Sequence, residues 1–121
     1  MSANAIHWFE IPALDMDRAV KFYNQVLGYS MASFDMFNCS MAMFPCESGV
    51  GGAICKQDNL QPSANGSVVY LDCGPDLSVA LAKVEPAGGK ILMPKSAIGE
   101  HGFIALFLDT EGNRVGLHSH A

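Results

Sequence analysis

The feature that most constrains the fold is an order of elements that occurs twice along the chain. Alternation of apolar and polar residues predicts a strand at 5–12, helical spacing predicts a helix at 14–28, and three short apolar runs follow. The same order, one strand, one helix and three strands, returns between residues 67 and 119. The two helices end near Gly28 and Gly88, one module length apart. An internal duplication is the most economical account of this order.

The first strand and the first helix are the most clearly marked elements. In the strand, Phe9 and Ile11 alternate with Trp8 and Glu10, so we expect the first pair to face a core and the second pair to face away from it. In the helix, apolar residues recur at helical spacing, with Asp15 or Asp17 as the N-cap and Gly28 as the stop.

The later elements follow from turn residues and short apolar runs. A polar connection over 56–67 separates the two repeats and contains proline, asparagine and glycine. The predicted elements around it are strands at 31–37, 40–45 and 51–56, then a strand at 67–73, a helix at 75–89, and strands at 90–94, 102–109 and 113–119.

These elements predict a single α+β domain over residues 1–121, with one βαβββ module over 1–60 and a second over 61–121. A helix covers one face of the strands in each module. When the two modules pair, their strands form a curved mixed sheet whose other face encloses a cavity, and such a cavity suits a small-molecule ligand.

Composition narrows the class of partner. The chain has a net charge of −5 and 16% charged residues, so we expect neither nucleic acid nor a membrane surface as a partner. No N-terminal stretch has the pattern of a secretory signal, and we expect a soluble, cytoplasmic protein. The four cysteines form no C-x-x-C pair, which argues against a zinc ribbon or a thioredoxin-type site and, in the cytoplasm, against a disulfide framework.

Three stretches of the chain together resemble the vicinal oxygen chelate superfamily, which includes glyoxalase I, extradiol dioxygenases, fosfomycin-resistance enzymes and bleomycin-binding proteins. The stretches are FEIPALDMDRAVKFYNQVLGY, SGVGGAI, and AGGKILMPK followed by GFIALFLDTEGNRVGL. The resemblance covers essentially the whole chain and is strongest to small glyoxalase-like proteins. It implies a glyoxalase-like fold of two βαβββ modules. It does not name a reaction, since this fold hosts lyases, oxygenases, transferases and binding proteins.

The resemblance also implies where the metal-dependent members hold a divalent ion. Those members take histidine or glutamate ligands from the first and last strands of each module. The motifs place these positions at Trp8, near Gly52 or Ala53, at Ser67, and at Gly116. A catalytic metal needs about three protein ligands of suitable type. Tryptophan, glycine and alanine supply none and serine is a poor ligand, so we expect neither a metal site nor a cofactor.

Two side chains close to these positions carry acid–base chemistry. Glu10 and His118 lie two residues beyond Trp8 and Gly116, so strand alternation places them on the same faces. Facing each other across a cavity, they would form a catalytic acid–base pair, and they are also the candidates for a shifted metal site. The alternatives are a structural carboxylate and an exposed histidine near the end of the chain.

Trp8, Ser67, Val69 and Gly116 are the candidates for contact with a ligand. Trp8 offers a large surface on which an aromatic or planar molecule can stack. The alternative is that the indole only fills the volume that a metal centre occupies in relatives. Ser67, Val69 and Gly116 are predicted to line the same cavity.

Two classes of function follow. The chain either binds or transforms a small metabolite in the inter-module cavity, as a glyoxalase-like lyase or isomerase without the usual metal, or it sequesters a small molecule such as a drug, as the bleomycin-binding relatives do. The resemblance also implies a homodimer. Neither the ligand nor a module-swapped arrangement follows from the sequence.

Overall fold

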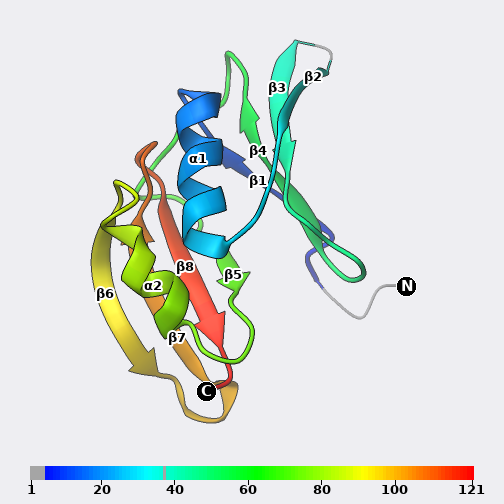
Figure 1. Cartoon of the computed structure of the whole chain (residues 1–121). Coiled ribbons are helices and arrows are strands. Elements are labelled where there is room, and N and C mark those ends of the chain that lie inside the picture. The colour runs from blue at the N-terminus through cyan, green and yellow to red at the C-terminus, as the bar shows by residue number, and fades with distance from the viewer. Residues whose placement is uncertain (1–4, 37) are drawn as a thin grey trace.

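The computed structural model describes residues 5–36 and 38–121, and Phe37, the last residue of one predicted strand, lies outside them. The order of elements confirms the duplicated pattern (Figure 1). The elements are β1 (Trp8–Pro12), α1 (Met16–Leu27), β2 (Ser33–Met36), β3 (Cys39–Met43), β4 (Gly51–Lys56), β5 (Tyr70–Asp72), α2 (Ser78–Val84), β6 (Lys90–Ala97), the 3₁₀ turn η1 (Gly99–His101), β7 (Phe103–Leu108) and β8 (Arg114–Ser119). The helix α2 and the strand β5 are shorter than their predicted spans.

Two four-stranded mixed sheets carry the two repeats, with orders β1-β4-β3-β2 and β5-β8-β7-β6. In each sheet the first strand of the module runs parallel to the last, and the other neighbours are antiparallel. This confirms the α+β fold of two βαβββ modules. Within this one chain the expected curved sheet is divided into two sheets, which stand on either side of α1 (Figure 1).

The two modules correspond residue by residue in their central strands. The N–H of Ala13 donates to the carbonyl of Cys55 (2.8 Å), and the N–H of Cys73 donates to the carbonyl of His118 (2.9 Å). Ala13 therefore corresponds to Cys73, and Cys55 to His118. This equivalence lets positions on one sheet be compared directly with positions on the other.

The helix α1 begins and ends as its sequence predicts. Asp15 is the N-cap, and its carboxylate accepts a hydrogen bond from the N–H of Arg18 (3.1 Å). Gly28 ends the helix in the left-handed conformation (φ 72°), and its N–H donates to the carbonyl of Asn24. A side chain would be strained at this φ, so the glycine is the reason that the chain can leave the helix here.

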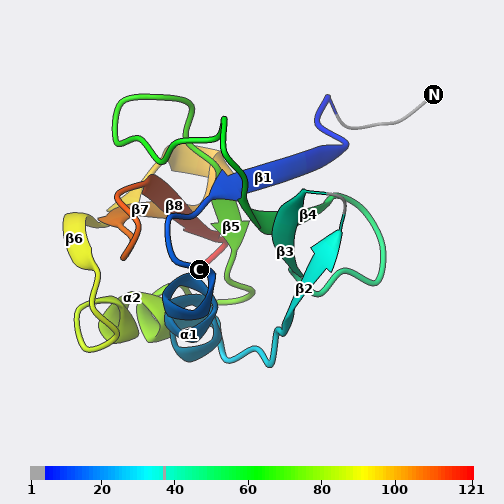
Figure 2. The ribbon, with the colours of Figure 1, turned by 90° about the horizontal axis from the view of Figure 1, so that it is seen from above.

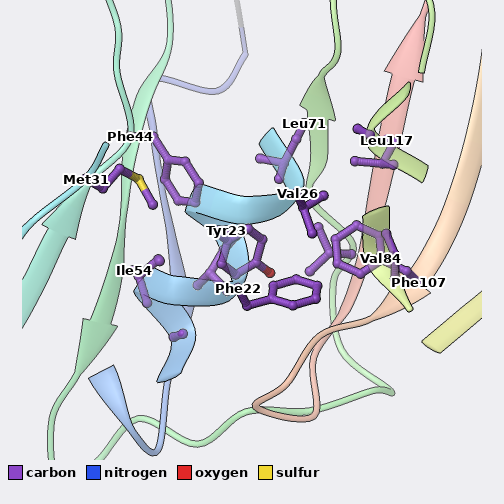
Figure 3. Packing of buried hydrophobic residues seen from close by; sticks show 14 of the residues in the cluster. Phe22, Tyr23, Val26, Met31, Phe44, Ile54, Leu71, Val84, Phe107 and Leu117 are labelled. Carbon is purple, nitrogen blue, oxygen red and sulfur yellow. The ribbon is translucent and has the colours of Figure 1, made fainter. Parts of the chain in front are cut away.

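One hydrophobic core joins both helices and both sheets (Figure 3). Tyr23 and Phe22 are neighbours on α1 and are almost fully buried, and between them they contact both modules. The ring of Tyr23 lies 5.6 Å from that of Phe44, which follows β3, and the ring of Phe22 lies 5.7 Å from that of Phe107 on β7. The helix α1 therefore packs between the modules and holds them together.

The two helices lie side by side and cover one face of the sheets (Figure 2). On β1, Ile11 is 3% exposed and Phe9 packs against the core, whereas Trp8 is 42% exposed and Glu10 is also exposed. The predicted alternation of this strand is confirmed. Trp8 and Glu10 therefore lie on the face that the helices leave uncovered.

The turn between β7 and β8 fastens the second module to the start of α1. Asp109 accepts from the hydroxyl of Tyr23 (2.7 Å), and the side-chain amide of Asn113 donates to the carbonyl of Pro12 (2.7 Å). Glu111 accepts from Arg18 and from the backbone at the N-terminus of α1. Asp109, Glu111 and Asn113 are each 4–5% exposed. The Arg18 side chain is 49% exposed, but the Glu111 carboxylate that it pairs with is buried in this network.

Among the described residues, neither helix has the length and apolar character needed to cross a membrane.

Candidate functional site

A cavity of about 600 Å³ lies between the modules and is lined by residues of β1 and β5 and by the segments next to them. This volume is in the range of small-molecule sites. Aromatic side chains form much of its wall, namely Trp8, Phe9, Tyr29, Phe44 and Tyr70.

The structure brings together some of the predicted site residues and separates others. Trp8, Ser67 and Val69 all line the inter-module cavity. Glu10 and His118 are not among its lining residues, and neither is Gly116. The predicted ligand contacts are therefore largely grouped, whereas neither member of the predicted acid–base pair lines this cavity. The roles of these residues stay predictions.

Trp8 is held against the neighbouring strand by two contacts. A Cβ atom at Gly51, the partner of Trp8 on β4, would lie 3.1 Å from the indole ring. The ring therefore lies close to the backbone of β4 at a position without a side chain. The indole N–H donates to a carboxylate oxygen of Glu10 (3.3 Å). Glu10 therefore orients the ring, and the ring remains accessible to a ligand.

Tyr70 is a site residue that the sequence reasoning missed. It pairs with Gly116 across β5 and β8, and a Cβ atom at Gly116 would lie only 2.2 Å from the Tyr70 ring. The ring therefore lies directly over the glycine, while 46% of Tyr70 stays exposed and lines the cavity. Strand alternation could have found it, because Tyr70 lies on the face opposite the buried Leu71.

His118 is engaged elsewhere on the second sheet. Its Nε2 atom lies 2.6 Å from the carbonyl oxygen of His101, which can only accept, so Nε2 carries a proton and donates it. The ring of His120 meets the His118 ring edge-on at 5.1 Å. This geometry orients the imidazole toward η1, just before β7, and leaves Nδ1 as its other polar atom.

Glu10 lies beside a buried thiol as well as beside Trp8. Burial raises the pKa of Cys55 to about 12, and the neighbouring Glu10 carboxylate adds to the shift through its charge and a hydrogen bond. Cys55 is 2% exposed. The thiol therefore stays protonated at neutral pH, so Cys55 is not a nucleophile.

The polar groups of the cavity are few. Ser48 and Ser67 contribute hydroxyl groups, and Asp72 contributes the only charged side chain among the described residues that line it. Tyr29 and Asp72 both line the cavity, and the pKa of Tyr29 is raised first by burial and then by the charges of Cys73 and Asp72. The cavity is thus mainly aromatic, with a negative charge at one side.

Comparison with known proteins assigns this architecture to a family. Residues 6–45 match the family described as bleomycin resistance protein-like N-terminal. A glyoxylase-like domain-containing protein of Didymella fabae is 30% identical over 119 residues, which cover 89% of this chain and 88% of that protein. The chain belongs to the glyoxalase/bleomycin resistance/dioxygenase superfamily. Within this superfamily it is a glyoxalase-like domain protein.

Two solved structures share the fold over the whole chain. A glyoxylase/bleomycin resistance protein/dioxygenase domain from a Frankia species superposes with a TM-score of 0.73 at 16% identity, covering 100% of this chain and 93% of that one. TnmS3, an antibiotic binding protein from a Streptomyces species, superposes with a TM-score of 0.66 at 20% identity, covering 100% of this chain and 99% of that one. At such identities these similarities concern the fold.

The residues of this superfamily member do not fit a divalent metal at the positions implied by its metal-dependent relatives. By the correspondence of the modules, the counterpart of Trp8 is Val68, next to Ser67, and the counterpart of Gly116 is Ala53. None of these side chains is a usual metal ligand. Among the described residues, no group of three or more histidine, cysteine, aspartate or glutamate side chains is placed to hold a metal ion.

Proposed function

We propose that the chain binds a small apolar or aromatic molecule in the inter-module cavity, without a catalytic divalent metal. The observation that carries the proposal is the cavity itself, whose wall includes the exposed rings of Trp8 and Tyr70. Concave sites with aromatic walls and few polar groups are typical of small-molecule recognition. The side chains at the family's metal positions, which are not metal ligands, support binding that is independent of a metal.

The ligand class is either a metabolite or a drug. A drug is supported by the likeness to TnmS3, an antibiotic binding protein whose whole length corresponds to this chain. Transformation of a metabolite by a lyase or isomerase would need Glu10 and His118 to reach one substrate. The cavity of one chain is lined by neither, so ligand capture is the function that the geometry favours.

A thermal-shift screen against metabolites and antibiotics tests this function. A ligand at roughly 100 times its Kd adds about 2.7 kcal/mol to the free energy of unfolding, which raises Tm by several degrees. We expect the shift to persist in the presence of EDTA, because no metal takes part. Trp8→Leu should reduce it strongly, since the largest ring in the cavity is lost. A stoichiometric divalent ion whose removal abolishes the shift would contradict the proposal.

We also propose that the protein is a homodimer. Phe34, Met36 and Met43 are each at least 40% exposed, and the registers of β1 to β4 place them on the same open face as Trp8. An exposed apolar sheet face of this kind is typical of an interaction surface.

The free thiols of all four cysteines support the cytoplasm as the compartment.

The dimer predicts an effect of charge on the open sheet face. Met43→Lys should shift the protein from dimer to monomer in sedimentation or light-scattering measurements, because the lysine would be desolvated at the interface. Val79→Lys is the matched control, since Val79 is 63% exposed on α2, on the other side of the molecule. A dimer that survives Met43→Lys, or a wild-type protein that is monomeric at high concentration, contradicts this assignment.

A further inference from the structure

The inter-module cavity presents two aromatic rings in the same way. Trp8 rests against Gly51 on β4, and Tyr70 lies over Gly116 on β8. A ring that covers a glycine lies against the backbone, so its other face is left for a ligand. Trp8 is 42% exposed and Tyr70 is 46% exposed, although both line a cavity. Each module thus contributes one ring to a surface suited to a planar molecule.

The electrostatics of these rings favour positive charge. The face of an aromatic ring is negative and attracts cations, most strongly for tryptophan. The Trp8 N–H donates to the carboxylate of Glu10 (3.3 Å), and a hydrogen bond to an anion polarises its donor, which makes the indole face still more negative.

The charged side chain on the cavity wall, Asp72, is negative, like the faces of the aromatic rings. Asp72 lines the wall together with Tyr70, and one of its oxygens accepts from the N–H of Gly74 (2.9 Å), which holds the side chain in place. Among the described lining residues of this cavity there is no lysine, arginine or histidine; Lys83 shares with Asp72 a separate groove beside α2. An anionic ligand would therefore meet a carboxylate without a compensating cation, whereas a cationic ligand would gain a counter-charge.

We infer that the cavity selects a planar aromatic molecule that carries a positive charge, with Trp8 and Tyr70 as the stacking surfaces and Asp72 as the specificity-determining residue. This inference rests on the proposed function and names the chemical class of its ligand. Asp72 acts by attraction at the cavity wall, and Glu10 acts through the indole of Trp8.

Three acridines that share one ring system test the inference. At neutral pH 9-aminoacridine is a cation, acridone is neutral and acridine-9-carboxylate is an anion. Fluorescence titration of the full chain should give roughly tenfold tighter binding of the cation than of acridone, and still weaker binding of the anion. Trp8→Leu should weaken the binding of all three, since each loses the same stacking surface.

The substitution that isolates the charge is Asp72→Asn, which keeps the acceptor for Gly74. It should lower the preference for the cation over acridone by about fivefold while leaving acridone unchanged. Asp58→Asn makes the same change in net charge at an exposed position outside the cavity and should leave the preference intact. An equal loss in the two variants would show that net charge alone attracts the dye and would overturn the role of Asp72.

The remaining outcomes separate the inference from the proposed function. Equal affinities for the three acridines, still dependent on Trp8, would overturn the preference for a cation and leave the aromatic binding site intact. Failure of all three to bind would overturn the inference, and the thermal-shift screen would then decide the proposed function separately. Tighter binding of the carboxylate would reverse the sign of the inferred selectivity.

Discussion

Replacing Glu111 by alanine is expected to lower the free energy of unfolding by about 2–4 kcal/mol, since a buried acceptor of several hydrogen bonds is lost. The Glu111 side chain is 1% exposed and binds Arg18 Nε at 2.6 Å. It also accepts from the N–H groups of Leu14 and Asp15, both at 2.8 Å, and from the hydroxyl of Thr110 at 3.0 Å. Alanine leaves these donors at the start of α1 without their partner.

Acid titration gives this prediction a second readout. Burial raises the pKa of Glu111, but the hydrogen bonds from Arg18, Asp15, Leu14 and Thr110 outweigh it, so the pKa lies below the ordinary value of 4.5. A carboxylate with a lowered folded pKa adds stability that is complete above its unfolded pKa and is lost as the pH falls through the folded pKa. Glu111→Gln should therefore be less stable at neutral pH and should lose less stability on acidification.

Denaturant unfolding at fixed protein concentration, from about pH 7 to about pH 3, measures both effects across the range where carboxylates titrate. Glu47→Gln is the matched control, because Glu47 is exposed in the connection between β3 and β4. It should change stability by less than about 0.5 kcal/mol. A Glu111→Gln protein with wild-type stability and wild-type acid dependence would show that the network does not fasten the modules.

This network also marks the limit of what local sequence signals predict. The buried Glu111 carboxylate, which pairs with Arg18, is an example. Its burial depends on the turn before β8 docking on the start of α1, across 93 positions of sequence. The local sequence patterns around Arg18 and around Glu111 do not indicate that these two segments are in contact. The caps of α1 and the alternation of β1 are local and were predicted correctly.

Phe22 illustrates the same limit within a single helix. Helical spacing predicts one apolar stripe facing one sheet. Phe22 is nevertheless 1% exposed, because α1 has a second neighbour and the ring packs near Phe107 and Gly89 of the other module. A helix that lies between two modules is buried on more of its surface than a single stripe describes.

At the site, the resemblance to the family showed that Gly116 cannot be a metal ligand, but it did not show that the Tyr70 ring covers this glycine. A glycine where relatives carry a metal ligand predicts the loss of metal binding, and nothing in the local sequence places a ring over it. Tyr70 occupies that space only because β5 and β8 pair in this register. Trp8 was easier to predict, since it stands at an implied ligand position on a strand with clear alternation.

Gly116→Ala is therefore expected to weaken the binding of 9-aminoacridine by at least about fivefold, close to the effect of Tyr70→Ala, while leaving the fold intact. The new methyl group would lie 2.2 Å from the Tyr70 ring, and because Tyr70 is 46% exposed, the ring can swing away instead of disrupting the core. Isothermal titration with the probe measures affinity, and the Tm reports on folding. Gly66→Ala is the matched control, since a Cβ atom there meets nothing within 4 Å.

A double variant that combines Gly116→Ala with Tyr70→Ala decides whether Gly116 acts through the Tyr70 ring. If it does, adding Gly116→Ala to Tyr70→Ala causes no further loss of affinity, because the ring that the methyl group displaces is already absent. Additive losses would mean that Gly116 contributes directly, for example by letting a ligand approach the backbone of β8. Wild-type affinity in Gly116→Ala would show that binding does not depend on the position of Tyr70, and would remove the second module's ring from the site.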